Sequence, residues 1–334
     1  MITLDIRHAI AGALAAAGYG AGTARSSDPG LRPGGQPGRY TSSVAFALAR
    51  TGPTRAPAEI ARRLATELTA YPWIASAAAA GQGQLTITVT RDALTGLAGR
   101  MTAAGLDCVR GDALAGQMIA APPAAGAWET AVTWGQARDA LAAELTASLA
   151  VAAGATASKA EGRADSSARS GEKGTEVAVA VAFAGTDAVR FSLARAAPGP
   201  SPRLDPEKMA RHLPGNPAYA VRYAHARAAS GMRWAAALGT GEAGPQRPPA
   251  DPGELALLDA LSWLPERVAI AARRSRPDEF ARYLEDVARV TLATLAGPGN
   301  RRSPGNDRLA LAAAARTGLA AGLGLLGVSA PDRL

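Results

Sequence analysis

The chain of 334 residues is long enough for two domains or three small ones, and its 48% hydrophobic content suffices for a packed core. Its formal net charge of +8, with only three lysines among the 36 basic residues, predicts affinity for a polyanion, and nucleic acid is the first candidate. Cys108 is the only cysteine, which excludes an internal disulfide and a cysteine-based zinc site. No stretch is long and apolar enough to cross a bilayer, and the N-terminus lacks a basic segment followed by an apolar run, so we expect a cytoplasmic protein.

The first hundred residues predict a mixture of helix and strand. Helix-spaced apolar residues predict helices over residues 3–17 and 42–50 and from Pro57 to about Tyr71. Strict alternation of apolar and polar residues over 84–90 predicts a half-buried strand. The Gly-x-Gly at residues 81–83 is interpreted as a tight turn, because a phosphate-binding loop should open a helix and not a strand. Residues 20–38 are rich in Gly, Pro and Ser and predict a loop.

The interval 106–200 predicts a small α/β segment. Residues 131–150 predict the end of a strand followed by a helix, residues 177–183 a short strand, and residues 188–196 a helix. Residues 154–175 are polar and rich in Ala, Gly and Ser, and they predict a flexible linker.

Residues 201–334 predict a bundle of about five helices. Apolar residues at helical spacing cover 255–273, 277–296 and 306–326, separated by Pro and Gly breaks. A further helix begins near Pro217 and has a small apolar face of Val221, Ala224, Ala228 and Met232. Its other face interleaves aromatic rings with guanidinium groups, the chemistry that stacks bases and holds phosphates, on Tyr219, Arg222, Tyr223, Arg227, Ser230, Arg233 and Trp234. On composition alone, buried tyrosines beside a solvated arginine edge remain an alternative.

Three motifs in order resemble the anticodon-binding domain of arginyl-tRNA synthetases. Residues 216–227 are similar to the family's Asn-Pro…Tyr-Val-Gln-Tyr-Ala-His-Ala-Arg helix, and residues 187–190 resemble the Asp-Ala-Leu-Arg tetrapeptide that gives the DALR domain its name. Residues 325–334 are similar to the family's Leu-Gly-Ile-Ser-Ala-Pro-Glu-Arg-Met terminus. The resemblance implies binding of tRNA, most simply arginine tRNA, with contacts to the anticodon arm from Tyr219, Arg222, Tyr223, Arg227, Arg233 and Leu334.

The N-terminal part resembles the additional N-terminal domain of the same family. Residues 38–45 are similar to the family's Gly-Asp-Tyr-x-Ser-Asn-Val-Ala, and residues 80–83 to its Ala-Gly-Pro-Gly. In the family this domain holds the D-loop of the tRNA, which implies D-loop contacts from Arg39 and Tyr40. Arg39 stands where the family has Asp and Ser43 where it has Asn, so a phosphate contact from Arg39 is expected in place of a base contact.

The motifs with which the family activates arginine are absent from this sequence. His8, His212 and His225 are the only histidines, and none lies in a His-x-Gly-His arrangement. Residues 132–138 occupy the best position for a decayed copy of that motif, since a helix follows them. Residues 208–211 bear a passing likeness to the Lys-Met-Ser-Lys-Ser loop, but they stand after the Asp187–Arg190 motif and are interpreted as helix surface. We predict no catalytic residues, no metal site and no cofactor.

The sequence therefore predicts a non-catalytic tRNA-binding relative of arginyl-tRNA synthetase with an α-rich α/β fold. Its parts are an N-terminal α+β domain (1–105), a degenerate small α/β middle segment (106–200) and a C-terminal DALR-type helical domain (201–334). Fewer than 90 residues lie between 112 and 200, too few for a nucleotide-binding domain of about 100–150 residues. Two alternatives stay open. One is an arginine-tRNA ligase, or a subunit of one, whose partner supplies the ATP site. The other is a protein interaction module that pairs with a cognate synthetase or pathway enzyme.

Overall fold

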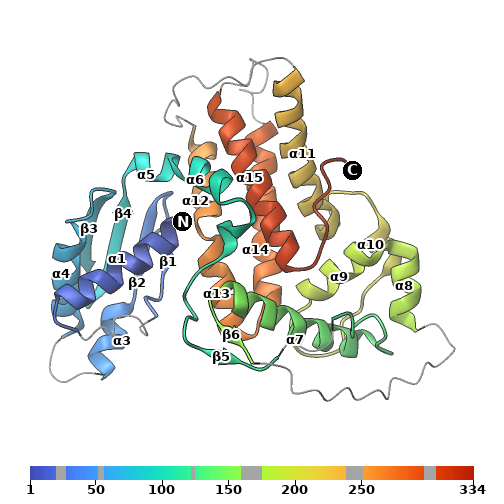
Figure 1. Ribbon diagram of the computed structural model, residues 1–334, viewed down its shortest axis with the longest axis horizontal. Coiled ribbons are helices and arrows are strands. Elements are labelled where there is room, and N and C mark those ends of the chain that lie inside the picture. The colour runs from blue at the N-terminus through green and yellow to red at the C-terminus, as the bar shows by residue number, and fades with distance from the viewer. Residues whose placement is uncertain (20–27, 52–55, 122–124, 159–174, 238–250, 297–305) are drawn as a thin grey trace. The chain divides into compact units, whose positions relative to one another are not determined.

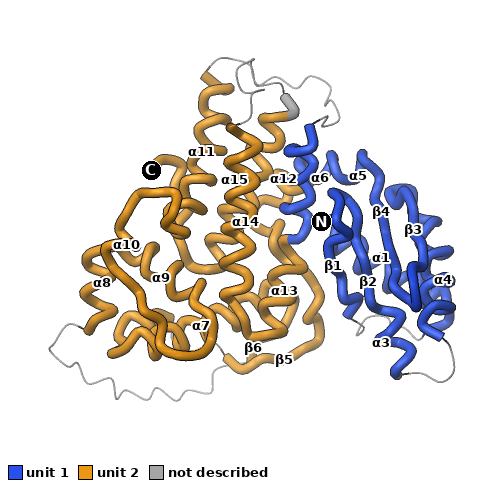
Figure 2. The backbone as a smooth tube through the Cα atoms, turned by 180° about the vertical axis from the view of Figure 1, so that it is seen from behind, with its two compact units in different colours: residues 1–100, 245–263 blue, residues 101–244, 264–334 orange. Residues whose placement is uncertain are grey.

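A computed structural model describes residues 1–19, 28–51, 56–121, 125–158, 175–237, 251–296 and 306–334 (Figure 1). The chain divides into two compact units, Met1–Arg100 with Pro245–Trp263, and Met101–Gly244 with Leu264–Leu334 (Figure 2). The predicted middle segment thus shares a unit with the C-terminal helices. The predicted boundaries at residues 105 and 200 stay a prediction.

The first unit is an antiparallel four-stranded sheet with helices packed on it. The sheet order is β1-β2-β4-β3. The α4 helix packs on β3 and β4, and both α1 and α3 pack on α4. The elements are α1 (Ile2–Ala16), β1 (Arg32–Pro33), β2 (Arg39–Ser42), α3 (Val44–Thr51), α4 (Pro57–Leu68), β3 (Ile74–Ala80), β4 (Gln84–Val89), α5 (Arg91–Thr95) and α12 (Pro252–Ser262).

The local patterns of this unit form the elements that they predict. Leu85, Ile87 and Val89 of β4 are buried, as the alternation indicates. Residues 81–83 make the tight turn into β4, and Gly83 has φ 139°. A Cβ at Gly83 would lie 2.5 Å from the Cβ of Pro57, so the turn depends on glycine at this position. Of the predicted loop at 20–38, residues 20–27 lie outside the described part, and residues 32–33 form β1.

A helix from late in the chain completes the first unit. Asp259 of α12 accepts a hydrogen bond from the backbone N–H of Gly38 at 2.9 Å. The Tyr40 hydroxyl shares a hydrogen bond of 2.9 Å with the Ser262 hydroxyl, and the Tyr40 ring lies 5.3 Å from the Trp263 ring between centroids. Tyr40 is 0% exposed, and this burial raises the pKa of its phenol. The Tyr40 ring is thus part of the core of this unit, and its predicted contact with a D-loop stays a prediction.

The second unit is mainly helical. Its only sheet within the described residues is β5 paired in parallel with β6, and α7 connects the two strands. Its elements are α6 (Leu97–Ala104), which begins in the first unit, a 3-10 turn (Gly105–Val109), β5 (Met118–Ile119), α7 (Trp134–Ala152), β6 (Thr156–Ala157), α8 (Glu176–Ala184), α9 (Thr186–Arg195), α10 (Pro206–Ala210), α11 (Pro217–Ala237), α13 (Leu264–Arg274), α14 (Pro277–Ala296) and α15 (Asn306–Leu325).

Three predicted elements differ from the structure. The predicted strand 177–183 is the helix α8, whose first turn is capped by the Thr175 side chain accepting from the Ala178 N–H at 3.1 Å. Residues 131–133 are loop and not the end of a strand, and Thr133 forms a capping box with Gln136 at the start of α7. The predicted helix 255–273 is divided at Trp263 into α12 and α13. Of the predicted linker at 154–175, residues 159–174 lie outside the described part of the chain.

The small apolar face of α11 packs as predicted at three of its four residues. Val221, Ala224 and Ala228 are fully buried, Met232 is half-buried, and α11 lies against α14 and α15 (Figure 1). Small side chains on this face allow the helices to approach closely. An α-rich fold with an α+β N-terminal part and a helical C-terminal part is thus confirmed. None of the helices in the described ranges has an apolar run able to span a membrane.

Candidate nucleic-acid interface

Three aromatic rings are stacked at the start of α11. The rings of Tyr219 and Tyr223 lie 5.5 Å apart between centroids with an interplanar angle of 15°, as expected for residues one helical turn apart. The His212 ring lies 5.3 Å from the Tyr219 ring between centroids, at an angle of 11°. Tyr223 is 38% exposed, and His212 is also exposed. We call His212, Tyr219 and Tyr223 the ring stack.

The loop before α11 is fixed by a buried amide. The Asn216 side-chain NH₂ donates to the carbonyl oxygens of Met209 at 2.7 Å and Arg211 at 2.8 Å. Asn216 is 7% exposed, and a buried amide without hydrogen-bond partners would cost free energy. These two bonds satisfy both donors of its NH₂ group. His212 follows directly after Arg211, so the amide of Asn216 constrains the backbone from which the His212 ring projects.

The ring stack continues along α11 toward its C-terminal end. Arg227 lies one turn beyond Tyr223 and is half-buried, and it makes no ion pair with the part of the chain that the structure describes. Trp234 lies about two turns further and is 66% exposed. A guanidinium that lies between exposed rings along a helix is suited to phosphate binding between stacked bases.

Two other predicted arginines hold the C-terminal segment, residues 327–334. Arg222 donates from Nη2 to the Ser329 hydroxyl at 3.1 Å and pairs with Asp187 at 3.3 Å. Arg233 donates from Nη1 to the carbonyl of Asp332 at 2.8 Å. The structure thus separates the predicted set: Tyr219 and Tyr223 are stacked, while Arg222 and Arg233 contact the segment that ends in the exposed Leu334.

The Asp187–Arg190 motif contacts the same C-terminal segment. The Asp187 carboxylate accepts from the backbone N–H of Ser329 at 3.0 Å and also from its hydroxyl. Arg190 donates from Nε to the Leu326 carbonyl at 2.6 Å. Gly327 has φ 66°, and a Cβ there would lie 2.5 Å from Arg190 Nε. The first residue of the motif therefore bonds the chain after Gly327, at Ser329, and the last residue bonds it before Gly327, at Leu326.

His225 and Asp332 complete these contacts. The His225 Nδ1 lies 3.0 Å from the Pro331 carbonyl, so the neutral ring donates there. Burial lowers the pKa of His225. Arg316 forms two bonds to the Asp332 carboxylate, at 3.0 and 3.1 Å, and these lower the pKa of Asp332. His225 is thus a buried hydrogen-bonding residue.

The first unit contributes one exposed predicted residue. Arg39 is exposed on β2, opposite Thr88 of β4, whereas its neighbour Tyr40 is buried. Arg39 is therefore available to a phosphate from the surface of its own unit.

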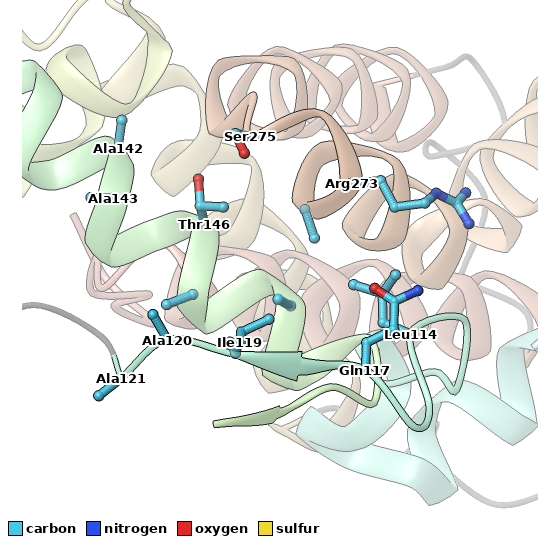
Figure 3. Close-up of a pocket in the computed structure, with 13 residues that line it drawn as sticks. Leu114, Gln117, Ile119, Ala120, Ala121, Ala142, Ala143, Thr146, Arg273 and Ser275 are labelled. Atoms are coloured by element: carbon cyan, nitrogen blue, oxygen red, sulfur yellow. The ribbon is translucent and has the colours of Figure 1, made fainter. Parts of the chain in front are cut away.

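A cavity of about 640 Å³ lies in the second unit, between α7, β5 and the end of α13 (Figure 3). Most of its wall is alanine, and the polar side chains at it are Gln117, Thr146, Arg273 and Ser275. Arg273 pairs with the buried Glu266 at 3.3 Å, so its charge is already compensated. Cys108 lies elsewhere in this unit, and burial raises its pKa to about 11, which leaves little thiolate at neutral pH.

A comparison with known protein families finds a match over the C-terminal third of the chain. The family model "DALR anticodon binding domain" matches residues 221–334, which include most of α11 and all of α12 to α15. Residues 221–334 are thus similar to a DALR anticodon-binding domain. The matched range contains Tyr223, Arg227 and Leu334, while Tyr219 and His212 lie just before it.

Curated relatives are arginine–tRNA ligases. The enzyme of Frankia alni is 41% identical over 160 residues, covering 45% of this chain and 29% of the ligase. The enzyme of Paenarthrobacter aurescens is 40% identical over 168 residues, covering 46% of this chain and 30% of the ligase. This chain therefore spans less than a third of the length of these relatives. The arginyl-tRNA synthetase of Thermus thermophilus aligns over 59% of this chain and 32% of its own, with 26% identity and a TM-score of 0.40.

Proposed function

We propose that this protein binds tRNA, most simply arginine tRNA, through the anticodon arm and without charging it. The observation that carries the proposal is the ring stack with Arg227 one turn away, which forms no ion pair with the described residues, on a helix most of which lies in the match to an anticodon-binding domain. Aromatic rings bind unpaired bases by stacking, and guanidinium groups bind the phosphates between them.

Each exposed residue then has a role. Tyr223 stacks an unpaired base, Arg227 holds a phosphate, and Leu334 lies against the RNA at the end of the C-terminal segment. Arg222 and Arg233 act through that segment, since both contact it. Arg39 of the first unit binds a phosphate of the D-loop.

The absence of the two nucleotide-binding motifs from the sequence supports a function without aminoacylation. ATP–pyrophosphate exchange with arginine tests this point directly. Exchange by the protein alone would contradict the proposal. Exchange that appears only with an added partner would favour a ligase subunit, which the names of the curated relatives suggest.

The binding test is a titration of purified arginine tRNA, followed by fluorescence anisotropy, at 50 and 200 mM salt. Two or three phosphate contacts predict that the affinity falls about ten-fold between these conditions. A noncognate tRNA tests selectivity, and sequencing of RNA that co-purifies with the tagged protein identifies the natural ligand. No binding at either salt concentration would contradict the proposal and favour a protein partner.

A further inference from the structure

The ring stack has two exposed ends, Tyr223 and His212, each of which stacks with Tyr219 at an interplanar angle of 15° or less. Tyr219 itself is half-buried. A flat ligand can therefore stack on the exposed ring at either end. Periodicity along α11 gives no indication of the second end, because His212 belongs to the preceding loop.

The backbone of the loop that carries His212 is held by Asn216. Asn216 bonds the carbonyls of Met209 and Arg211, which fixes the backbone on the N-terminal side of His212. On the other side, Asn216 itself leads into Pro217, the first residue of α11. The five-residue segment 211–215 is thus closed by one buried side chain. A loop whose backbone is fixed in advance loses less conformational entropy when a ligand stacks on its ring.

We propose that the outer face of His212 is a second stacking position for an unpaired nucleobase, and that Asn216 is its positioning residue. The inference rests on the proposed function and specifies the kind of RNA that the site takes. Both ends of the stack require a base whose face is free, which a base inside a duplex does not offer. The exposed Arg211 beside His212 supplies a cation for the adjoining phosphate. The preferred ligand is therefore an RNA loop with two bases turned outward.

The test uses the full chain and a labelled RNA hairpin with the stem and seven-nucleotide loop of an anticodon arm. His212→Ala should weaken binding of the hairpin about five-fold or more, the effect of losing one stacked base. His212→Phe should retain wild-type affinity, because a phenyl ring preserves the stacking face. Leu213→Ala is the matched control, since Leu213 is its exposed neighbour and is not part of the stack, and it should leave the affinity unchanged. A loop-free duplex of the same stem should bind wild type and His212→Ala equally.

The role of Asn216 is tested by a double-mutant cycle. Asn216→Ala should weaken binding of the hairpin in the wild-type background and have little further effect in the His212→Ala background, because it acts through His212. Thermal unfolding verifies that each variant is folded. If His212→Ala binds the hairpin as tightly as wild type while Tyr223→Ala does not, this inference is wrong and the proposed function stands. If wild type binds no RNA, the proposed function fails and this inference fails with it.

Discussion

The contact between Asp187 and Ser329 provides a quantitative test of how the C-terminal segment is held. Replacing Asp187 by alanine removes two hydrogen bonds to Ser329 and the ion pair with Arg222. Hydrogen bonds to charged groups contribute about 1.5–3 kcal/mol each when buried. Asp187 and Arg222 are 26% and 24% exposed, so solvent reduces these values, and we expect a total loss of about 1.5–3 kcal/mol.

The assay is hydrogen exchange at the Ser329 amide, combined with urea unfolding. A loss of 1.5 kcal/mol predicts that this amide exchanges about ten-fold faster in Asp187→Ala. The matched control is Asp286→Ala, which removes an exposed ion pair with Arg289 elsewhere in the same unit and should change stability by less than about 0.5 kcal/mol. If Ser329 exchanges equally fast in wild type and both variants, the motif does not hold the C-terminal segment and the reasoning is refuted.

Three further changes test the fold. Tyr40→Phe removes a buried hydrogen bond to Ser262 and should lower the free energy of unfolding by about 1–2 kcal/mol in urea titrations, with RNA affinity unchanged. A loss of RNA affinity without a loss of stability would contradict a purely structural role of the Tyr40 hydroxyl. Burial lowers the pKa of His225, so as the pH falls the unfolded chain binds a proton at this residue before the folded protein does. The contribution of the neutral ring to the free energy of unfolding is therefore complete above the ordinary histidine pKa of about 6.5, and it is lost as the pH falls toward the pKa in the folded protein. His225→Gln should therefore lose less stability than wild type between pH 7.5 and 5.5, and equal losses would contradict this account. Gly83→Ala forces a Cβ to within 2.5 Å of Pro57 at a positive φ and should lower the unfolding temperature by several degrees, whereas Gly99→Ala, with open space around it, should not.

The elements that could be predicted are those whose signal is local. The strand β4 follows from six residues of alternation, and the buried face of α11 follows from small apolar residues at helical spacing. The helix α8 could not be predicted in the same way. Its residues after Glu176 are all apolar, so no polar face distinguishes a strand from a helix. The N-cap at Thr175 and the helix propensity of alanine favour the helix.

The site was only partly predictable because its contacts are distant in sequence. Tyr40 is covered by Ser262 and Trp263, more than two hundred positions later, and no local pattern indicates this. The sequence predicts Arg222 as a phosphate ligand, yet in the structure its guanidinium contacts Ser329 and Asp187. His212 lies in a loop with no periodicity, and the one signal for it is that an Asn-Pro pair follows within five residues and closes that loop.

The most direct test of the account is the affinity of arginine tRNA for wild type, Tyr223→Ala and Arg227→Gln, measured by anisotropy at low and moderate salt. We predict that wild type binds, that Tyr223→Ala weakens binding about five-fold or more at both salt concentrations, and that Arg227→Gln reduces the salt dependence by about one phosphate contact. Binding that is indifferent to salt and equal in the three proteins would contradict the claim that the exposed face of α11 holds unpaired RNA.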